Sequence, residues 1–547
     1  VVDSNRVSVT GEDVFKKKPA NLIRLFAIAD EQGLDIHPDA LTLASRNCRL
    51  INSENRTDPE MRDLFLGVLT DGKDPGLALR LMNEAGVLGR YLPEFGGIVA
   101  QTQFNMYHHF TVDEHTIRAI EYMTESERKG GDSLELAKEI FGQIDNRRAV
   151  YLAMLLHDTG KGHGDQQIEG TKTAARACKR MGLEPAEVEL ISWLVGHHLE
   201  MSETAQKRDI ADPVTIVRFA ELVGDMQRLR LLYLLTVADI RAVGPGIWNA
   251  WKGQLLSELY HNTAAALRGG RTDEKLVAAE LRARANKNKY AVEHSLGTIP
   301  PVMLDMESAY WTGFDVETLE RHAEILCREE ERPIVSAKLR EDGGGVSLVV
   351  AGNDRLGLFA RLAGAIAVQG ANVVSAQVFT SASGFIIDVF ILQDKNGGPF
   401  ATDDPERLSR LETAVRKVMI SDEPLRNVPV RTSRREAAFL VQPSVHIHEE
   451  ESSDYTVIDL AGRDRLGLLH DVASILADAH IAIHSAHVGS YGERVFDAFY
   501  VRLPERWDAD RKTVLKQQLM DALKRDEPDA PRTPARKLKQ ANAADSF

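Results

Sequence analysis

The chain has 547 residues, of which 43% are apolar and 27% are charged. This length is too great for one hydrophobic core and predicts three or four domains of a globular protein. Its 81 Asp and Glu outnumber its 67 Lys and Arg, which gives a formal net charge of -14. That acidic balance argues against a dedicated nucleic-acid-binding protein, because such proteins usually carry a basic face.

Cysteine usage and hydropathy indicate the compartment. The three cysteines, Cys48, Cys178 and Cys327, lie far apart and lack any C-x-x-C spacing. We therefore expect a cytoplasmic protein with neither disulfides nor a cysteine zinc site. No apolar run approaches the roughly 20 residues of a membrane span, and no signal peptide is visible, so no membrane association is expected. The chain opens with Val1 in polar sequence, which is typical of a fragment whose natural start lies upstream.

The first half of the chain reads as helices. PANLIRLFAIADEQG, from Pro19, has helical apolar spacing and ends in Gly, a usual stop signal. DPEMRDLFLGVLTDG from Asp58 and DPGLALRLMNEAGVLGRYLPEFG from Asp74 both open with Asp-Pro, which suits a helix start. Residues 101–250 are also mainly helical and hold most of the histidines. Residues 251–340 are charged and alanine-rich, and we expect a helical connector there.

Short β-branched runs begin near Gly345 and return further along as an internal repeat. The sequence Asp354 to Leu358, DRLGL, recurs without a gap as Asp464 to Leu468. Asp388 in FIIDVF recurs as Asp497 in RVFDAF after the loss of one residue in the intervening turn. We predict two copies of a strand–loop–helix–strand–strand unit, at 345–420 and 455–525. The segment 421–452 is polar and irregular, and the Pro-rich, charged tail 526–547 is expected to be disordered.

Four places in the helical region could converge on one site. They are His115 in TVDEHTIRAIEYM, His157-Asp158 after an apolar run, His197-His198 after ELISWLVG, and Asp239 at the end of LRLLYLLTVAD. Helical bundles build metal sites from such side chains on facing helices, and imidazole with carboxylate suits Mn, Fe, Zn or Mg. An ion there would lower the pKa of a bound water and polarise a phosphoryl oxygen. Lys161 is placed to hold a phosphate as a point charge.

Each residue has an ordinary alternative interpretation. A lone His115 is more often a plain helix histidine, only one of His197 and His198 is expected to point inward, and an Asp at a helix end is usually a turn or cap residue. Four such coincidences within one helical region are hard to accept, so the pattern favours a metal site.

The motif HDTGKG, with His115 and Asp239, resembles the HD superfamily of metal-dependent phosphohydrolases. The flanking NMYHHFTVDEHT, HHLEMSETAQKRDIADP and LTVADIRAVGPGIWNAWK are similar to the bifunctional uridylyltransferase/uridylyl-removing enzymes of the PII nitrogen-signalling protein, and the resemblance covers nearly the whole chain. It implies an HD domain at 101–250 that hydrolyses the phosphodiester joining UMP to a tyrosine of PII. It implies a divalent metal, Mn or Mg, held by His115, His157, Asp158 and Asp239. His198 would be a further ligand or phosphate contact, and Asp158 and Lys161 the catalytic residues.

Two departures from that family stand out. The family begins with a nucleotidyltransferase domain carrying a Gly-Ser loop and an Asp-x-Asp pair, and the first 100 residues contain no such arrangement. We expect this chain to lack uridylylating activity, although a full-length parent would have it. The family also commonly has Gly-Asp-His-Ser after the Gly-rich turn, whereas GHGDQQIEG places Gln166 after Asp165. A ligand or a second metal would then be missing, unless His163, which could equally be an exposed loop residue, compensates.

The repeats place Gly357 and Gly467 where a strand gives way to a helix. Glycine there lets backbone N–H groups approach a ligand, and a helix N-terminus favours a carboxylate. Asp354 and Asp464 could accept from an amino group, although DRLG could equally be a turn with a helix cap. The units resemble ACT domains, α+β ferredoxin-like modules that bind amino acids between paired copies. In the resembled family they are thought to sense glutamine, which implies a glutamine-regulated hydrolase with reciprocal coupling, and they could support a homo-oligomer.

Two other functions stay open. Guanosine tetraphosphate hydrolases also pair an HD domain with an ACT domain, but they carry a synthetase and a ubiquitin-like domain between the two and usually one ACT copy. The second is a non-catalytic amino-acid sensor whose HD domain has decayed, as Gln166 hints. Metal content would discriminate, because a decayed site should purify without metal.

Overall fold

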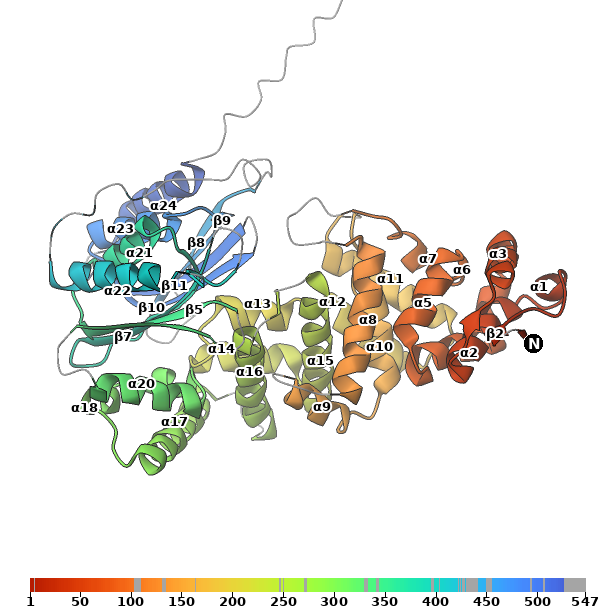
Figure 1. Ribbon diagram of the computed structural model, residues 1–547, viewed down its shortest axis with the longest axis horizontal. Helices are drawn as coiled ribbons and strands as arrows, with labels where there is room; N and C mark the ends of the chain where they lie inside the picture. The colour runs from red at the N-terminus through yellow and green to blue at the C-terminus, as the bar shows by residue number, and fades with distance from the viewer. Residues whose placement is uncertain are drawn as a thin grey trace, which may run out of the picture.

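The computed structural model of the chain shows an elongated molecule, with helices toward one end and two β-sheets toward the other (Figure 1). The expected disordered tail and His163 both lie outside the described residues. The structure describes residues 1–525 except 4, 103–109, 130–133, 163, 245–246, 249, 270–272, 329–332, 341–343, 395–397, 403, 422, 424, 426–427, 429–440, 449–454, 492–493 and 505–506.

The N-terminal part is a helical layer with a small sheet of two-residue strands in the order β1-β2-β3. Its elements are β1 (Val2–Asp3), β2 (Arg6–Val7), α1 (Val14–Lys17), α2 (Asn21–Gln32), β3 (Asp35–Ile36), α3 (Pro38–Asn47), η1 (Cys48–Leu50), η2 (Asn55–Thr57), α4 (Pro59–Leu66), η3 (Gly67–Asp71), α5 (Pro75–Glu84), α6 (Val87–Tyr91) and α7 (Pro93–Gly96). Both predicted Asp-Pro starts are confirmed. The side chain of Asp58 accepts from the backbone N–H of Glu60, and that of Asp74 from Leu77, so each aspartate caps its helix.

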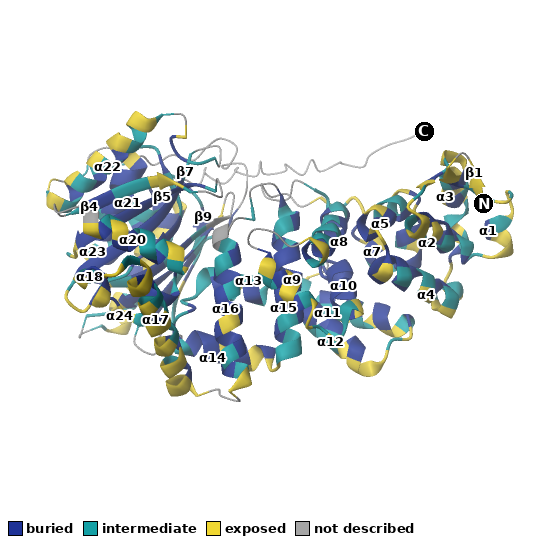
Figure 2. Ribbon diagram, turned by 60° about the horizontal axis from the view of Figure 1, so that its bottom comes forward, coloured by how far each residue is buried: buried dark blue, intermediate teal, exposed yellow. Residues whose placement is uncertain are grey.

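The middle part is a helical bundle built around α10. Its helices are α8 (Val112–Arg128), α9 (Glu135–Phe141), α10 (Arg147–Leu156), α11 (Gln166–Arg180), α12 (Pro185–Gly196), α13 (Glu200–Lys207), α14 (Pro213–Val223) and α15 (Met226–Val243). Every residue from 149 to 156 is buried, and α10 packs against α8, α12 and α15. Figure 2 shows these helices dark at their mutual contacts and yellow outside. Because α10 is apolar on all sides, it lies at the centre of the bundle and carries the residues after Leu156 into its interior.

A second group of helices leads to the sheets, as expected for the connector. These are α16 (Ala250–Arg268), α17 (Glu274–Leu296), α18 (Pro301–Leu304), α19 (Ser308–Thr312) and α20 (Val316–Arg328). Trp311 and Tyr310 are fully buried in a cluster that also includes residues of the first sheet, such as Phe385. The connector is therefore packed onto that sheet.

The internal repeat is confirmed as two units of the same topology. The first comprises β4 (Ile334–Leu339), β5 (Val346–Asn353), α21 (Leu358–Val368), β6 (Asn372–Gln377), β7 (Phe385–Gln393) and α22 (Pro405–Ile420). The second comprises β8 (Ser444–His448), β9 (Thr456–Arg463), α23 (Leu468–Asp478), β10 (Ala482–Tyr491), β11 (Arg494–Arg502) and α24 (Ala509–Lys524). Both sheets are antiparallel, in the orders β4-β5-β7-β6 and β8-β9-β11-β10.

Each sheet starts earlier than the ranges expected from the repeat. Strand β4 pairs with β5, so residues 334–339 belong to the first sheet and not to the connector. Strand β8 likewise pairs with β9, inside the segment read as irregular. Self-similarity could not reveal these strands, because IVSAKL and SVHIH share no pattern.

The two units lie side by side. Edge strand β6 contacts edge strand β10, and helix α21 contacts α23 on one face of the sheets. One hydrophobic cluster runs through both units and includes Phe390 and Phe499. Asp388 pairs with Val350 and Asp497 with Leu460, so the repeated aspartate has the same register in both sheets.

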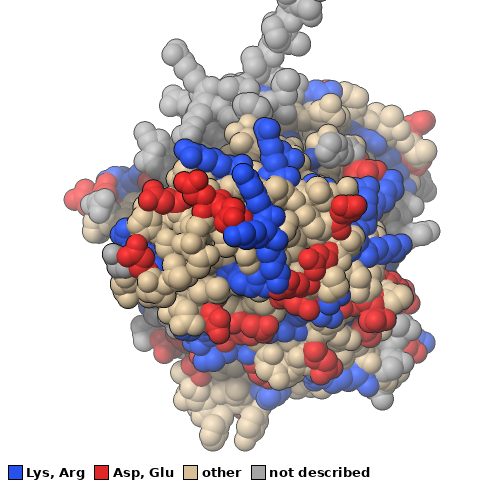
Figure 3. Space-filling model, turned by 90° about the vertical axis from the view of Figure 1, so that its right-hand side faces the viewer, with Lys and Arg blue, Asp and Glu red and all other residues tan. Residues whose placement is uncertain are grey.

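Charges of both signs lie on the surface of the N-terminal end. On the face at the N-terminal end, basic side chains gather near the centre and acidic ones surround them (Figure 3). Lys18 and Arg24, in this part of the chain, both pair with Glu60. Among the described helices, none is long and apolar enough to cross a membrane.

Candidate metal centre

The turn after α10 is shaped to deliver two adjacent polar residues to the bundle interior. The side chain of Asn146 caps α10 by accepting from the N–H of Ala149. After the helix, Gly160 lies so close to α11 that a Cβ there would come within 2.4 Å of the backbone nitrogen of Gly170. Asp165 then caps α11 by accepting from two backbone N–H groups. This tight turn brings His157-Asp158 and the first residue of α11, Gln166, to the same place.

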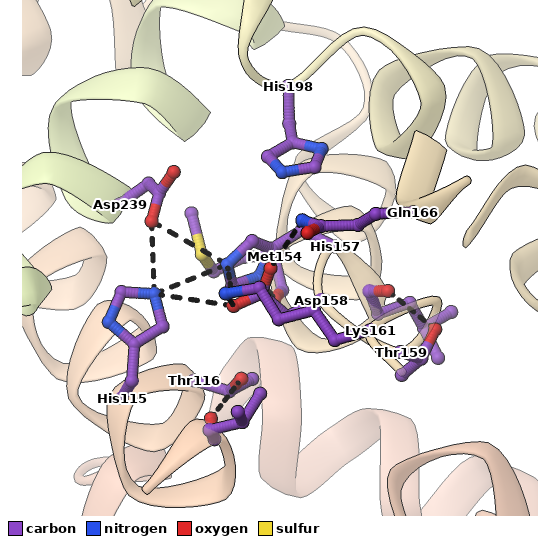
Figure 4. A network of polar contacts seen from close by, with 12 residues as sticks. His115, Thr116, Met154, His157, Asp158, Thr159, Lys161, Gln166, His198 and Asp239 are labelled. Atoms are coloured by element: carbon purple, nitrogen blue, oxygen red, sulfur yellow. Dashed lines mark hydrogen bonds and ion pairs between the residues drawn. The ribbon is translucent and has the colours of Figure 1, made fainter. Parts of the chain in front are cut away.

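The structure brings His115, His157, Asp158 and Asp239 together (Figure 4). The Nε2 atom of His115 lies 3.3 Å from Nε2 of His157 and 3.0 Å from Oδ1 of Asp239. Oδ2 of Asp158 lies 3.3 Å from Nε2 of His157 and 3.8 Å from that of His115. The side chains of His115, His157 and Asp158 are at most 2% exposed. Asp239 does not end its helix as expected, since α15 continues to Val243.

Three of these four separations, those of 3.0 and 3.3 Å, fit a shared metal ion. Ligands at about 2.1 Å from an octahedral or tetrahedral ion lie roughly 3.0 to 3.4 Å from one another. One ring nitrogen of His157 is within 2.7 Å of the carbonyl of Met154, and one of His198 is within 2.7 Å of Val195. A carbonyl can only accept, so each Nδ1 carries a proton, and Nε2 is the ring nitrogen that remains to bind a metal in place of a proton. Such carbonyl contacts orient metal-binding histidines.

The electrostatics of the cluster favour a bound cation. Burial lowers the pKa of His157, but the carboxylates of Asp158 and Asp239 outweigh it and raise that pKa to about 10. Despite burial, the neighbouring histidines hold the pKa values of both carboxyls well below their usual range, with a further contribution from Lys161 at Asp158. Two ionised carboxylates in a buried site require positive charge, which a divalent metal supplies.

Lys161 and Gln166 both bind the same carboxylate. Nζ of Lys161 donates to Oδ2 of Asp158 over 2.5 Å, and Nε2 of Gln166 donates to Oδ1 over 3.1 Å. Gln166 therefore occupies a position beside the cluster, with its amide nitrogen turned toward Asp158 (Figure 4). The sequence marked Gln166 as a departure from a family pattern, but nothing in the sequence indicated that its side chain contacts Asp158.

Of the two adjacent histidines, His198 lies at the cluster. It is 1% exposed, and its ring centre is 5.3 Å from that of His157. His197 instead stacks on Trp193 with ring centres 4.6 Å apart, and a ring nitrogen contacts the carbonyl of the same residue.

The repeats form a second candidate site, a small cavity between the two units. Asp464 and Gly467 line it together with Asp497 and, from the first unit, Asn372. Gly467 has φ of 87°, the left-handed conformation in which glycine is favoured, and it caps α23. Asp354 and Gly357 occupy the matching loop of the first unit, where Gly357 has φ of 80°.

Sequence reasoning missed one residue of this interface. A ring nitrogen of His470 contacts the carbonyl of Ala360 over 2.7 Å, and His470 also lines the cavity. A Cβ on Gly364 would lie 2.7 Å from that ring nitrogen, so the glycine leaves room for the imidazole. The repeat alignment matches His470 with Ala360 itself, so comparing the copies shows a difference there but no contact.

Comparison with known proteins agrees with this geometry. Residues 1–91 match the domain family described as Uridylyltransferase GlnD third domain, and residues 112–241 match the HD domain. The HD match begins at the first residue of α8 and includes all of the clustered residues. The HD domain implies a divalent metal site, and the group formed by His115, His157 and Asp158 is suited to hold such an ion.

Relatives extend the match to almost the whole chain. The chain is 46% identical over 542 residues to the bifunctional uridylyltransferase/uridylyl-removing enzyme of Caulobacter vibrioides (strain NA1000 / CB15N), covering 97% of this chain and 57% of that protein. It is 45% identical over 543 residues to the protein of the same name from Phenylobacterium zucineum (strain HLK1), covering 97% and 58%. It is 41% identical over 518 residues to the protein of the same name from Azospirillum brasilense, and this match covers 92% of this chain and 55% of that protein. Over almost its whole length the chain is therefore similar to bifunctional uridylyltransferase/uridylyl-removing enzymes, and it spans a little over half the length of these relatives.

Proposed function

We propose that this chain is a metal-dependent phosphodiesterase that removes UMP from the uridylylated PII signalling protein. The observation that carries the proposal is the cluster in which the Nε2 atoms of His115 and His157 lie 3.3 Å apart, and each lies within 3.0 to 3.8 Å of an oxygen of Asp158 and of Asp239. The match to an HD domain and the uridylyl-removing activity named for the relatives support it.

His115, His157, Asp158 and Asp239 would hold a divalent metal, Mn²⁺ or Mg²⁺, with His198 as a further ligand or phosphate contact. A divalent ion supplies Lewis acidity toward a phosphoryl oxygen and lowers the pKa of water. Lys161 brings an ammonium group to the edge of the cluster, where it can neutralise a phosphate. Asp158 stays ionised between His157 and Lys161, so its carboxylate can accept a hydrogen bond from the attacking water and orient it.

The proposed regulator is glutamine, bound by the repeat units as ferredoxin-like ACT domains. Four antiparallel strands with two helices on one face support that fold. In the cavity between the units, Asp464 would accept from the α-amino group of the ligand. The N-terminus of α23 at Gly467 would receive the carboxylate. Asp354 and Gly357 would play the same parts in the first unit.

Hydrolysis is tested by UMP release from uridylylated PII, with Mn²⁺, with Mg²⁺ and with EDTA. We expect UMP release to depend on metal. The rate of release should fall at least about 100-fold in Asp158→Asn, because that change removes a ligand charge, and it should also fall in Lys161→Met. Asp63→Asn is the matched control, since it removes an exposed carboxylate from α4. Release that persists in Asp158→Asn, or in EDTA, would contradict the proposal.

Glutamine binding is tested by titration calorimetry on the full chain. We expect Asp464→Ala to weaken binding more than tenfold and Asp354→Ala to weaken it less, because the cavity is lined by Asp464. Asp478→Asn, an exposed carboxylate at the end of α23, serves as the control. Binding unchanged in both alanine variants would exclude the loops as the glutamine site.

The alternatives make different predictions in the same assays. A guanosine tetraphosphate hydrolase would release pyrophosphate from that nucleotide and leave uridylylated PII intact. A non-catalytic sensor would bind glutamine but neither hold Mn²⁺ nor release UMP. We further propose a cytoplasmic protein that could pair through its ACT domains; its cysteines are free thiols, as a reducing compartment requires.

A further inference from the structure

A second cavity lies at the junction of the helical bundle, the connector and both sheets. It is lined by the residues after α13, by α16, by the segment around α19, by the end of β6 and by β10. Its volume is about 30 Å³, which is room for two or three water-sized groups, since one water needs roughly 10–15 Å³. Glu307 lines it with a side chain that is 54% exposed, so the cavity reaches the surface on that side.

Unsatisfied polar atoms gather in this cavity. Oε1 of Glu258, Oε1 of Gln377, Oγ of Ser485 and Nε2 of His487 are all buried without a hydrogen-bond partner in the part of the chain that the structure describes. Three of these residues are more than nine-tenths buried: Glu258, Gln377 and Ser485 are 3%, 7% and 8% exposed. Buried polar atoms normally find partners, so four in one cavity indicate a bound group that supplies them.

All four atoms can accept a hydrogen bond, and carboxyl groups line the same cavity. Burial lowers the pKa of His487 to about 4, so its ring is neutral and an unprotonated nitrogen can accept. Three carboxyl residues line the cavity, namely Asp209, Glu258 and Glu307, and none of its described lining residues is Lys or Arg.

Two cations whose charge acts on the cavity residues, Arg284 and Arg208, are engaged elsewhere. Arg284 lowers the pKa of Glu258 by its charge, but burial and Asp209 prevail and raise that pKa to about 8. Its guanidinium donates to Oδ1 of Asn262 over 2.7 Å. Arg208 is paired with Asp459. With that pKa, Glu258 is mostly protonated at neutral pH in the empty cavity, and a bound cation would favour its carboxylate form by displacing the proton.

We propose that this junction cavity binds a small monovalent cation, and that the cation is ammonium. Ammonium is close to water in size, carries one positive charge and has four N–H donors for the four acceptors. Water offers only two donors and has no charge that would favour the carboxylate form of Glu258. An α-amino acid does not fit, because the cavity is too small and none of its described lining residues is a Lys or Arg that could receive the carboxylate. Potassium shares the charge and size but donates no hydrogen bonds.

The position of the cavity gives the cation a structural consequence. Asp209 lies two residues beyond the end of α13, and its backbone N–H donates to the hydroxyl of Tyr500 on β11 over 2.7 Å. A cation bound among α16, β6 and β10 would tie the helical bundle to both sheets. Its binding should therefore raise the thermal stability of the full chain.

The test is thermal unfolding of the full chain in ammonium, potassium, sodium and tetramethylammonium chloride at equal ionic strength. We expect a saturable rise in Tm of ~1–2 °C with ammonium, a smaller one with potassium, and none with tetramethylammonium. Glu258→Gln keeps the side-chain shape and should abolish the ammonium response. Glu280→Gln, on the exposed face of α17, makes the same charge change outside the cavity and should retain it.

A second variant and a direct measurement guard against a folding defect. Ser485→Ala removes one acceptor and should raise the half-saturating ammonium concentration about tenfold. Crystals soaked in thallium(I), a monovalent stand-in for ammonium, should show an anomalous peak beside Glu258. The proposal would be overturned by equal Tm shifts in all four salts or by a response to potassium equal to that to ammonium. It would also be overturned by an ammonium response that survives in Glu258→Gln, or by crystals that show density for water alone in the cavity.

Discussion

The guanidinium of Arg208 donates two hydrogen bonds, of 2.7 and 2.8 Å, to the carboxylate of Asp459. Arg208 directly follows α13, a helix that begins two residues after His198. Asp459 lies on β9 of the second sheet. A bidentate pair of this kind is geometrically specific, so it links the edge of the metal cluster to the proposed sensor through one short helix.

Breaking this pair should uncouple regulation from hydrolysis. In Asp459→Asn the carboxylate charge is lost, and we expect the effect of glutamine on UMP release to shrink several-fold, since allosteric couplings are typically about 1–3 kcal/mol. The rate without glutamine should stay within about twofold, because Asp459 does not touch the cluster. Parallel rate measurements with and without glutamine check this, and an unchanged glutamine effect would rule out the pair as a link.

Removing a cluster carboxylate should empty the metal site without unfolding the chain. Asp239→Asn keeps the side-chain size but removes a charge that lies 3.0 Å from His115. We expect at least about a tenfold loss of metal affinity, measured as metal per chain by mass spectrometry after dialysis. Circular dichroism should show the helices retained, and Asp63→Asn should keep its metal. Full metal content in Asp239→Asn would remove this residue from the ligand set.

Gln166 should tune the site through Asp158. Gln166→Ala deletes the 3.1 Å hydrogen bond to Oδ1, and loss of such an outer contact typically costs about 10–100-fold in metal affinity. Gln166→His places an imidazole beside the cluster, and we expect it to raise the number of Mn²⁺ ions bound per chain. Competition with a chelating dye measures the first effect and metal analysis the second. Unaltered affinity in Gln166→Ala would mean that its amide only fills space.

The buried Asp497 predicts a pH dependence of stability. Burial and the nearby Asp464 raise its pKa to about 8, from an ordinary value of 3.8. The folded state then holds a proton that the unfolded state has lost between these pH values, so wild-type stability falls as pH rises from about 4 to about 8. The Asp497→Asn variant has no carboxyl group there to ionise, so its stability should not fall in this way. Its free energy of unfolding should rise relative to that of wild type as pH rises, by about 1–3 kcal/mol at pH 8.

Urea unfolding at pH 5 and pH 8, without amino acids, measures this difference. Asp478→Asn, which changes an exposed aspartate in the same unit, should show no such pH dependence. A constant difference between Asp497→Asn and wild type at both pH values would mean that Asp497 is ionised in the folded chain.

Much of the local structure was readable from the sequence because it depends on neighbours in the chain. Asp58 and Asp74 precede Pro at helix starts, and each caps its helix. The repeated DRLG and the repeated buried aspartate predicted two units of one topology. His115, His157-Asp158 and Asp239 could be selected as ligands because polar residues beside apolar helical runs are costly unless they share a partner.

Only the tertiary structure decided which of those side chains meet, because that depends on how distant segments pack. His197 and His198 are adjacent, yet one stacks on Trp193 and the other lies beside His157. The pairing of β4 and β8 with their sheets, the bond between Arg208 and Asp459, and the junction cavity all join segments that share no local pattern. Hydrophobic periodicity determines which face of an element is buried, whereas the partner across that face is determined only by the shape of the folded core.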